Sequence, residues 1–172
     1  MTALTSAVAA VITDPAGRVL LCQQRQGHQL WGLPGGGVRA GESPVHAVVR
    51  DVRTDTGTET ELVDLVGLYQ LTGDGCGDDL PDVLVHVFRG RLANADVAVN
   101  APDRISRLAW HDPACLPEPM TATTRAAVAD ALAGRSGVLR DVLRDVDPRS
   151  ADDEPWDEAA IPAQQPPAVP VS

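Results

Sequence analysis

Two aspartates and a glutamate lie close together in the segment GLPGGGVRAGESPVHAVVRDVRTDTGT, residues 32–58. Asp51 and Asp55 are four residues apart, about one turn of a helix, and Glu42 precedes that helix. Hard cations prefer oxygen ligands, and Mg²⁺ takes one or two carboxylates while keeping several waters. The segment therefore predicts a divalent cation site, with glycine carbonyls as additional ligands and Arg50 as an ion-pair partner for a carboxylate.

A short helix is predicted to carry these acids. Ser43 is a suitable N-cap, Pro44 stands at the first helical position, and Gly57 can end the helix in a left-handed conformation. Four valines follow the i, i+3, i+4, i+7 pattern of a buried stripe: Val45, Val48, Val49 and Val52. Thr54 and the two aspartates would then lie on the flank of this stripe, along the wall of a cleft.

This segment resembles the Nudix box, G-x5-E-x7-R-E-U-x-E-E-x-G-U, where U is a bulky aliphatic residue. Five fixed positions match at the required spacings: Gly36, Glu42, Arg50, Val52 and Gly57. The flanking sequences RVLLCQQR, LWGLPGGG and WHDPACLPEPM also resemble those of bacterial, MutT-like members, and the likeness covers residues 6–134.

The resemblance implies an α/β fold, a Nudix-type α/β/α sandwich with a mixed β-sheet. It also implies a hydrolase that uses Mg²⁺ or Mn²⁺ to cleave a pyrophosphate bond in a nucleoside diphosphate linked to another group. Bound metal would neutralise charge on the pyrophosphate oxygens and lower the pKa of the attacking water. The expected partner is a small nucleotide-type substrate.

The resemblance further assigns roles to individual residues. Asp51 and Asp55 would be metal ligands together with the carbonyl of Gly36. Glu42 and Asp51 would hold metal-bound waters or orient the nucleophile, and Arg50 would orient a carboxylate. Three residues would contact the substrate: Arg25, Gly35 and Gly37.

Four positions depart from the box. Asp51 and Asp55 replace glutamates and are shorter by about 1.5 Å, the length of one C–C bond. Thr54 brings a hydroxyl without charge, expected to bond to a helix carbonyl, and Thr58 replaces the last aliphatic residue. Since disturbing a metal site costs about 10–100-fold in affinity or activity, we expect weakened catalysis at a site that still binds metal. A missing ligand could come from one of four other acids: Asp78, Asp79, Asp82 or Asp103.

Two alternatives to an active hydrolase remain open. A Nudix-fold module could bind a nucleotide as a sensor without turnover, an alternative favoured by Thr54. An interaction protein could instead use residues 137–146 and the acidic segment after Pro148.

Composition limits the class of protein. The net charge of −10 argues against binding to a nucleic acid backbone, which needs a basic face. All 14 basic residues are arginines, which excludes Schiff-base and phosphate-loop lysines. Three scattered cysteines suit a reducing compartment. The first apolar run is much shorter than the roughly 18 residues of a membrane span. We expect a cytoplasmic protein without a membrane or nucleic acid partner.

The remaining pattern predicts the other elements. Residues 6–13 and 18–22, separated by the turn DPAG, are expected to form a hairpin. Further strands are predicted at 59–71, 82–92 and 105–112, and helices at 121–134 and 137–146. The expected organisation is a Nudix domain at 1–134, an additional C-terminal amphipathic helix within 135–148, and a disordered, acidic, proline-rich tail at 149–172. Apolar pairs on the last helix leave a homodimer open.

Overall fold

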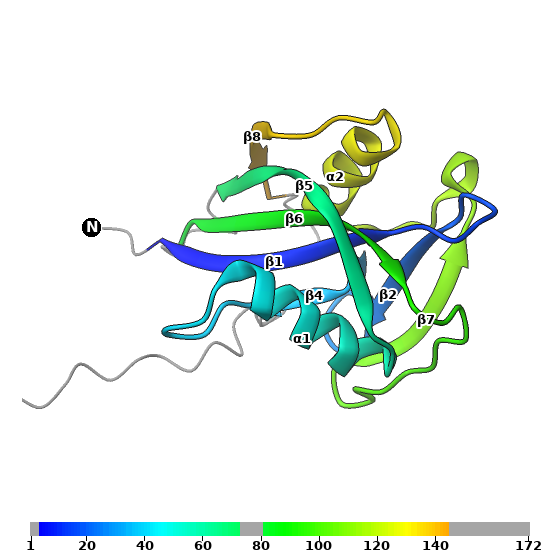
Figure 1. Ribbon diagram of the computed structural model, residues 1–172. Helices are drawn as coiled ribbons and strands as arrows, with labels where there is room; N and C mark the ends of the chain where they lie inside the picture. Colours follow the sequence, from blue (N-terminus) through cyan, green and yellow to red (C-terminus); the bar gives the residue numbers. More distant parts are fainter. Residues whose placement is uncertain (1–3, 73–80, 145–172) are drawn as a thin grey trace, which may run out of the picture.

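The computed structural model describes residues 4–72 and 81–144. Its strands are β1 (Thr5–Ile12), β2 (Val19–Gln24), β3 (Trp31–Gly32), β4 (Gly35–Gly37), β5 (Thr60–Thr72), β6 (Val83–Leu92), β7 (Ile105–His111) and β8 (Val138–Leu143). Its helices are α1 (Pro44–Thr56), a 3-10 turn at Pro113–Cys115 and α2 (Ala122–Leu132). The strands form a mixed sheet in the order β4-β1-β6-β5-β8 and a smaller antiparallel sheet in the order β3-β2-β7 (Figure 1).

The interior strand β1 has apolar side chains on both faces of the sheet, and each face is covered by a helix. Val8, Ala10 and Ile12 pack in the cluster that contains the buried side of α1. Ala9 and Val11 point to the other face, into the cluster that contains α2. Because both faces are covered, the strand is a nearly continuous apolar run without polar alternation. The predicted α/β/α arrangement with a mixed sheet is confirmed.

The predicted ends of α1 are confirmed, whereas its buried stripe is shifted. Ser43 Oγ accepts a hydrogen bond of 3.2 Å from the backbone N–H of His46, and Gly57 has φ of +72°. Val45, predicted to be buried, is 49% exposed. The buried side instead comprises Ala47, Val48, Asp51, Val52, Asp55 and Thr56. Both aspartates are therefore inside the protein instead of on a flank of the helix.

The predicted hairpin between the first two long strands is wrong. The turn itself forms, because the N–H of Asp14 bonds to the carbonyl of Arg18 at 3.0 Å, and Thr13 and Val19 form an isolated bridge. Beyond this bridge the strands separate, and β1 pairs with β4 and β6 while β2 pairs with β3 and β7. A tight turn can join two strands that pair with each other or two strands that belong to different sheets. The pairing with distant strands decides which of the two forms.

The predicted helix at 137–146 is also wrong, because residues 138–143 form β8. This strand pairs in parallel with β5 from Gly67 to Thr72. The two backbones approach closely at Gly67, where a Cβ would lie 2.4 Å from the carbonyl oxygen of Val138. The open edge of β5 offers the segment a row of hydrogen bonds, and local periodicity does not reveal that edge.

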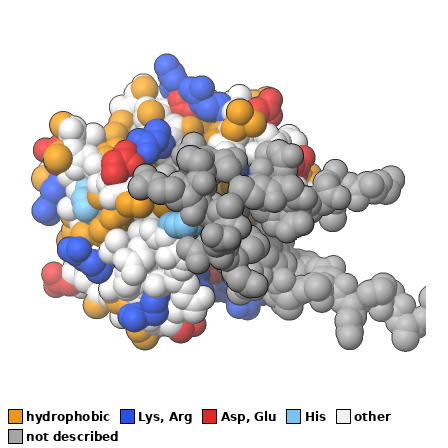
Figure 2. All heavy atoms as spheres, turned by 180° about the vertical axis from the view of Figure 1, so that it is seen from behind, with side chains coloured by type: hydrophobic (Ala, Val, Ile, Leu, Met, Phe, Trp, Pro, Cys, Tyr) orange, Lys and Arg blue, Asp and Glu red, His pale blue; other side chains and the backbone are white. Residues whose placement is uncertain are grey.

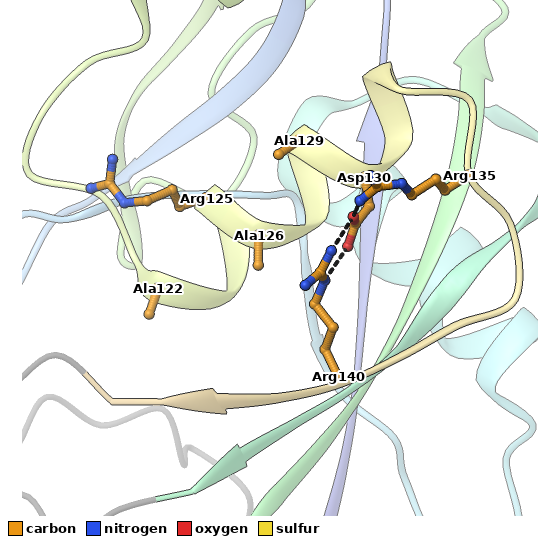
Figure 3. Close-up of a pocket in the computed structure, with 7 residues that line it drawn as sticks. All are labelled: Ala122, Arg125, Ala126, Ala129, Asp130, Arg135 and Arg140. Carbon is orange, nitrogen blue, oxygen red and sulfur yellow. Dashed lines mark hydrogen bonds and ion pairs between the residues drawn. The ribbon is translucent and has the colours of Figure 1, made fainter.

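Asp130 of α2 ties β8 to the rest of the fold. It is fully buried and accepts hydrogen bonds from Arg135 at 2.7 Å, from Arg140 of β8 at 2.6 Å, and from the hydroxyl of Tyr69 at 2.9 Å. Figure 3 shows the guanidinium groups of Arg135 and Arg140 both pointing at Asp130. The three residues help to line a hollow of about 350 Å³. Arg140 chiefly, with Arg135 and Tyr69, holds the pKa of this carboxyl well below its ordinary value.

The described surface carries charges of both signs. In Figure 2, arginine and acidic side chains are interspersed over the described residues that are visible, and they form no continuous basic patch there. No helix within residues 4–72 and 81–144 has the length and apolar character that a membrane crossing needs. The predicted disordered tail at 149–172 lies outside the described residues.

Candidate active site

The candidate site lies where α1 packs against β4. Asp51 is 8% exposed and Asp55 is 1% exposed, so both carboxylates are buried in this contact. The N–H of Gly35 donates a hydrogen bond of 3.1 Å to Asp55 Oδ2. A Cβ at Gly36 would lie 2.7 Å from Asp51 Oδ2. The glycines therefore allow two acidic side chains to lie against the backbone of a neighbouring strand.

The glycine segment forms the short strand β4, which pairs with β1. Val8 of β1 lies opposite Gly36, and the flanking bonds are from Ala10 N–H to the carbonyl of Pro34 at 2.9 Å and from Val38 N–H to the carbonyl of Ser6 at 3.0 Å. Polar backbone groups alternate in direction along such a pair. The N–H and C=O groups of Gly36 therefore point toward β1. Those of Gly35 and Gly37 point toward α1.

Arg50 organises one side of the site, as predicted. Its Nε and Nη2 donate to Asp51 Oδ1 at 3.1 and 3.0 Å, and Nη2 also donates to the carbonyl of Gly37 at 2.9 Å. Its Nη1 donates to Glu42 Oε2. Glu42 in turn accepts the backbone N–H of Arg39 at 3.0 Å, and this bond, together with Arg50, lowers its pKa. A planar guanidinium with five donors can make these contacts at once.

The two oxygens of the Asp51 carboxylate differ in their hydrogen bonds, because only Oδ1 accepts from Arg50. Oδ2 is buried and has no hydrogen-bond partner among the described residues. Burial raises the pKa of Asp51, although Arg50 opposes the increase. An unsatisfied buried oxygen of a carboxylate is costly, and it indicates a position for a cation or a water molecule. The donor is a hard oxygen, which fits Mg²⁺ or Mn²⁺.

Asp55 has a partner that sequence reasoning missed. Arg104, the residue before β7, donates from Nη2 to Asp55 Oδ1. Burial raises the pKa of Asp55 to about 6, and Arg104 limits the increase. Asp103, a candidate ligand from the same region, is exposed. No spacing rule connects residue 104 with residue 55, so only the fold reveals the pair.

Thr54 lies beside the site and is exposed. Its hydroxyl donates to the carbonyl of Arg50 at 2.9 Å, which confirms the expectation of a bond within the helix. The carbonyl of Thr54 accepts from Asn100 Nδ2 at 2.9 Å. These contacts connect α1 to the segment that leads to Arg104.

The other candidate residues are distributed as follows. Arg25 directly follows β2 and is exposed, and its N–H donates to the carbonyl of Arg104 at 2.9 Å. Its backbone is therefore close to the partner of Asp55. Asp82 contacts Gln70 through Oδ2 at 3.4 Å and Thr5 through its carbonyl at 2.9 Å, and neither partner is a residue of the box. Asp78 and Asp79 lie outside the described residues.

The acids alone do not form a complete metal centre. Within residues 4–72 and 81–144, no group of three or more His, Cys, Asp or Glu side chains is arranged to hold an ion. An ion here would need the two aspartates, a backbone carbonyl and water. That set still fits Mg²⁺, which commonly takes one or two carboxylates and keeps several waters.

Comparison with known proteins agrees with the fold and identifies the family. The NUDIX domain family model matches residues 3–131. A MutT-like protein from Streptomyces ambofaciens is 29% identical over 133 residues, covering 77% of this chain and 80% of the relative. An RNA pyrophosphohydrolase from Thioalkalivibrio sulfidiphilus is 37% identical over 57 residues, and the match spans about a third of each chain.

Among solved structures, the MutT NUDIX hydrolase from Burkholderia pseudomallei superposes with a TM-score of 0.67 at 27% identity, over 74% of this chain and 98% of that one. The protein therefore belongs to the Nudix family. The class of enzyme that the box predicted, a MutT-like Nudix pyrophosphohydrolase, is confirmed at the level of the family.

Proposed function

We propose that the protein is a metal-dependent hydrolase of a pyrophosphate bond in a small nucleotide-type substrate, a nucleoside diphosphate linked to another group. The observation that carries this proposal is the buried, unpartnered Oδ2 of Asp51 at the contact between α1 and β4. A second buried carboxylate, that of Asp55, lies one turn away on the same face of the helix. Two buried acids at this position favour a bound cation.

The expected ligands of Mg²⁺ or Mn²⁺ are Asp51 Oδ2 and the carboxylate of Asp55. The direction of the peptide groups in β4 favours the carbonyl of Gly35 as a backbone ligand over the predicted carbonyl of Gly36, whose peptide faces β1. The metal would polarise the phosphate oxygens and lower the pKa of the attacking water. Glu42 would orient that water, and Arg50 would hold Asp51 and Glu42 in place.

Substrate contacts are proposed at the mouth of the same site. Arg25 is exposed and its backbone is bonded to that of Arg104, so its side chain can reach solvent beside Asp55. Gly35 and Gly37 expose no side chains that would keep phosphates away from the backbone. The net charge of −10 supports a small substrate over a nucleic acid. Location in the cytoplasm and a homodimer stay predictions.

A sensor without turnover is the second candidate. Two observations favour it: the Thr54 hydroxyl is bonded within the helix, and Arg104 already neutralises Asp55. A site with Thr54 in place of a carboxylate, and with the Arg104 guanidinium in place of a metal ion, can bind a nucleotide without cleaving it. Binding without product separates this candidate from the enzyme.

The experiment is a hydrolysis screen with Mg²⁺ and with Mn²⁺. The panel contains nucleoside triphosphates, nucleoside diphosphates linked to sugars or nucleosides, and an RNA with a 5′-pyrophosphate. Wild type is compared with the double variant Glu42→Gln, Asp55→Asn. The control is the double variant Glu61→Gln, Asp96→Asn, which removes the same charge from two exposed positions.

Metal-dependent product from wild type and control, without product from the site variant, is the expected result. Product from the RNA alone would contradict a small substrate. Absence of product from every protein, with a nucleotide bound tightly by folded wild type, would support the sensor instead. Circular dichroism checks that each variant is folded.

A further inference from the structure

We propose that Arg104 is an internal competitor of the metal ion for Asp55. In this mechanism the guanidinium of Arg104 neutralises Asp55 when metal is absent, and it leaves the carboxylate when a divalent cation binds. Arg104 would then be a positioning residue that sets the metal affinity of the site. This inference rests on the proposed metal site.

The geometry supports two alternative partners for one carboxylate. Asp55 is almost fully buried, and its two oxygens have different contacts: Oδ2 accepts the N–H of Gly35, and Oδ1 accepts Nη2 of Arg104. A cation that binds Asp55 through Oδ1 needs the position that the guanidinium occupies. The carboxylate has no other described side-chain partner.

Arg104 is able to move away from Asp55. Its side chain is 45% exposed, whereas that of Asp55 is 2% exposed. The described structure gives its guanidinium no other hydrogen bond or ion pair with a side chain. The backbone of Arg104 is fixed separately, by bonds from its N–H to the carbonyl of Ala101 at 3.1 Å and from the N–H of Arg25 to its own carbonyl at 2.9 Å. The side chain can therefore turn toward solvent without disturbing the fold.

Arg50 differs from Arg104 in this respect. Arg50 contacts Asp51, Glu42 and the carbonyl of Gly37 at the same time, and no described residue donates to Asp51 Oδ2. Arg50 can therefore remain in place when an ion binds Asp51. The two arginines therefore have opposite effects on the proposed metal site. Arg50 holds the ligand Asp51 in place, whereas Arg104 occupies the ligand Asp55.

The experiment measures Mn²⁺ binding by wild type, Arg104→Gln and Arg104→Lys, with calorimetry or with the electron paramagnetic resonance signal of free Mn²⁺. Removing a competing charge at hydrogen-bond distance from the ligand should tighten binding by about tenfold. Arg104→Lys keeps the charge and should bind like wild type. Arg107→Gln is the matched control, since Arg107 is also at β7 but lies over the ring of Trp31, 5.8 Å from its centre.

A second measurement uses wild type itself and does not depend on the stability of a variant. The Nε–Hε resonance of Arg104, assigned by its absence from the spectrum of Arg104→Lys, is followed during titration with Mg²⁺. Release from Asp55 should move this resonance toward that of a solvated arginine. A resonance that stays unchanged at saturation would overturn the inference.

The outcomes separate this inference from the proposed function. Equal or weaker Mn²⁺ binding by Arg104→Gln, with wild type binding normally, would overturn the competition and leave the metal site intact. The same tightening in Arg107→Gln would assign the effect to general charge and also overturn it. Absence of Mn²⁺ binding in wild type and in all variants would overturn the metal site together with the inference.

Discussion

The hydroxyl of Thr54 donates a hydrogen bond of 2.9 Å to the carbonyl of Arg50, one turn earlier in α1. The bond satisfies the hydroxyl within its own helix, and the side chain is exposed. Thr54 therefore contributes no charge beside the two buried aspartates. The proposed metal site therefore has two carboxylates, those of Asp51 and Asp55, and both are shorter than the glutamates of the box.

Restoring a carboxylate at position 54 is expected to strengthen metal binding. Thr54→Glu adds a third acid next to Asp55, and it should lower the Kd for Mn²⁺ about tenfold. Titration calorimetry measures the change. Thr54→Gln has the same size without charge and should leave the Kd unchanged. Equal tightening by both variants would assign the effect to loss of the hydroxyl.

The close contact of β4 with β1 predicts a strong effect at Gly35. A Cβ there would lie 2.1 Å from the carbonyl oxygen of Val8, so Gly35→Ala should lower the free energy of unfolding by about 3 kcal/mol. At Gly32 the nearest atom to a new Cβ is 3.8 Å away. Gly32→Ala should therefore change the free energy of unfolding by less than about 0.5 kcal/mol. Urea unfolding measures both, and equal midpoints would contradict the packing.

The ion pairs of Asp130 predict a defined pH dependence of stability. Its pKa in the folded state is far below the ordinary value of 3.8, chiefly because of Arg140. The stabilisation is therefore complete above about pH 4 and is lost as the pH falls toward the lowered pKa. Asp130→Asn should reduce the free energy of unfolding at pH 7 by about 2 kcal/mol.

Urea unfolding of wild type and Asp130→Asn between pH 2 and pH 7 tests this dependence, and the difference should shrink below about pH 4. Asp96→Asn, at an exposed position, is the control and should follow wild type throughout. A difference that stays constant with pH would show that the carboxylate charge is not responsible.

The two faces of β8 provide a matched pair of substitutions. Val142 is buried in the core cluster, and Val142→Asp should reduce the free energy of unfolding by about 3 kcal/mol. Leu139 is 77% exposed, and Leu139→Asp should change it by less than about 0.5 kcal/mol. Thermal unfolding of Val142→Asp and Leu139→Asp compares the stability that each variant has lost. Equal effects would contradict the position of β8 at the sheet edge.

Local sequence patterns were sufficient to predict the Nudix family and the helix that carries the box. Ser43 and Gly57 are sufficient signals for the ends of α1, because capping depends on residues within one turn of each end. The spacing of the box places Asp51 and Asp55 on one face of that helix, since the helical repeat is fixed by the backbone. The apolar runs likewise predicted the position of most strands.

Strand pairing and the surroundings of each acid could not be predicted from local patterns, because both depend on long-range contacts. Residues 138–143 became a strand because β5 offers an open edge next to Gly67, and a local pattern contains no information about that edge. The contact between Arg104 and Asp55 joins residues 49 positions apart. The burial of Asp51 likewise depends on glycines in a strand of the sheet. These features depend on contacts between distant segments, and such contacts exist only after the chain has folded.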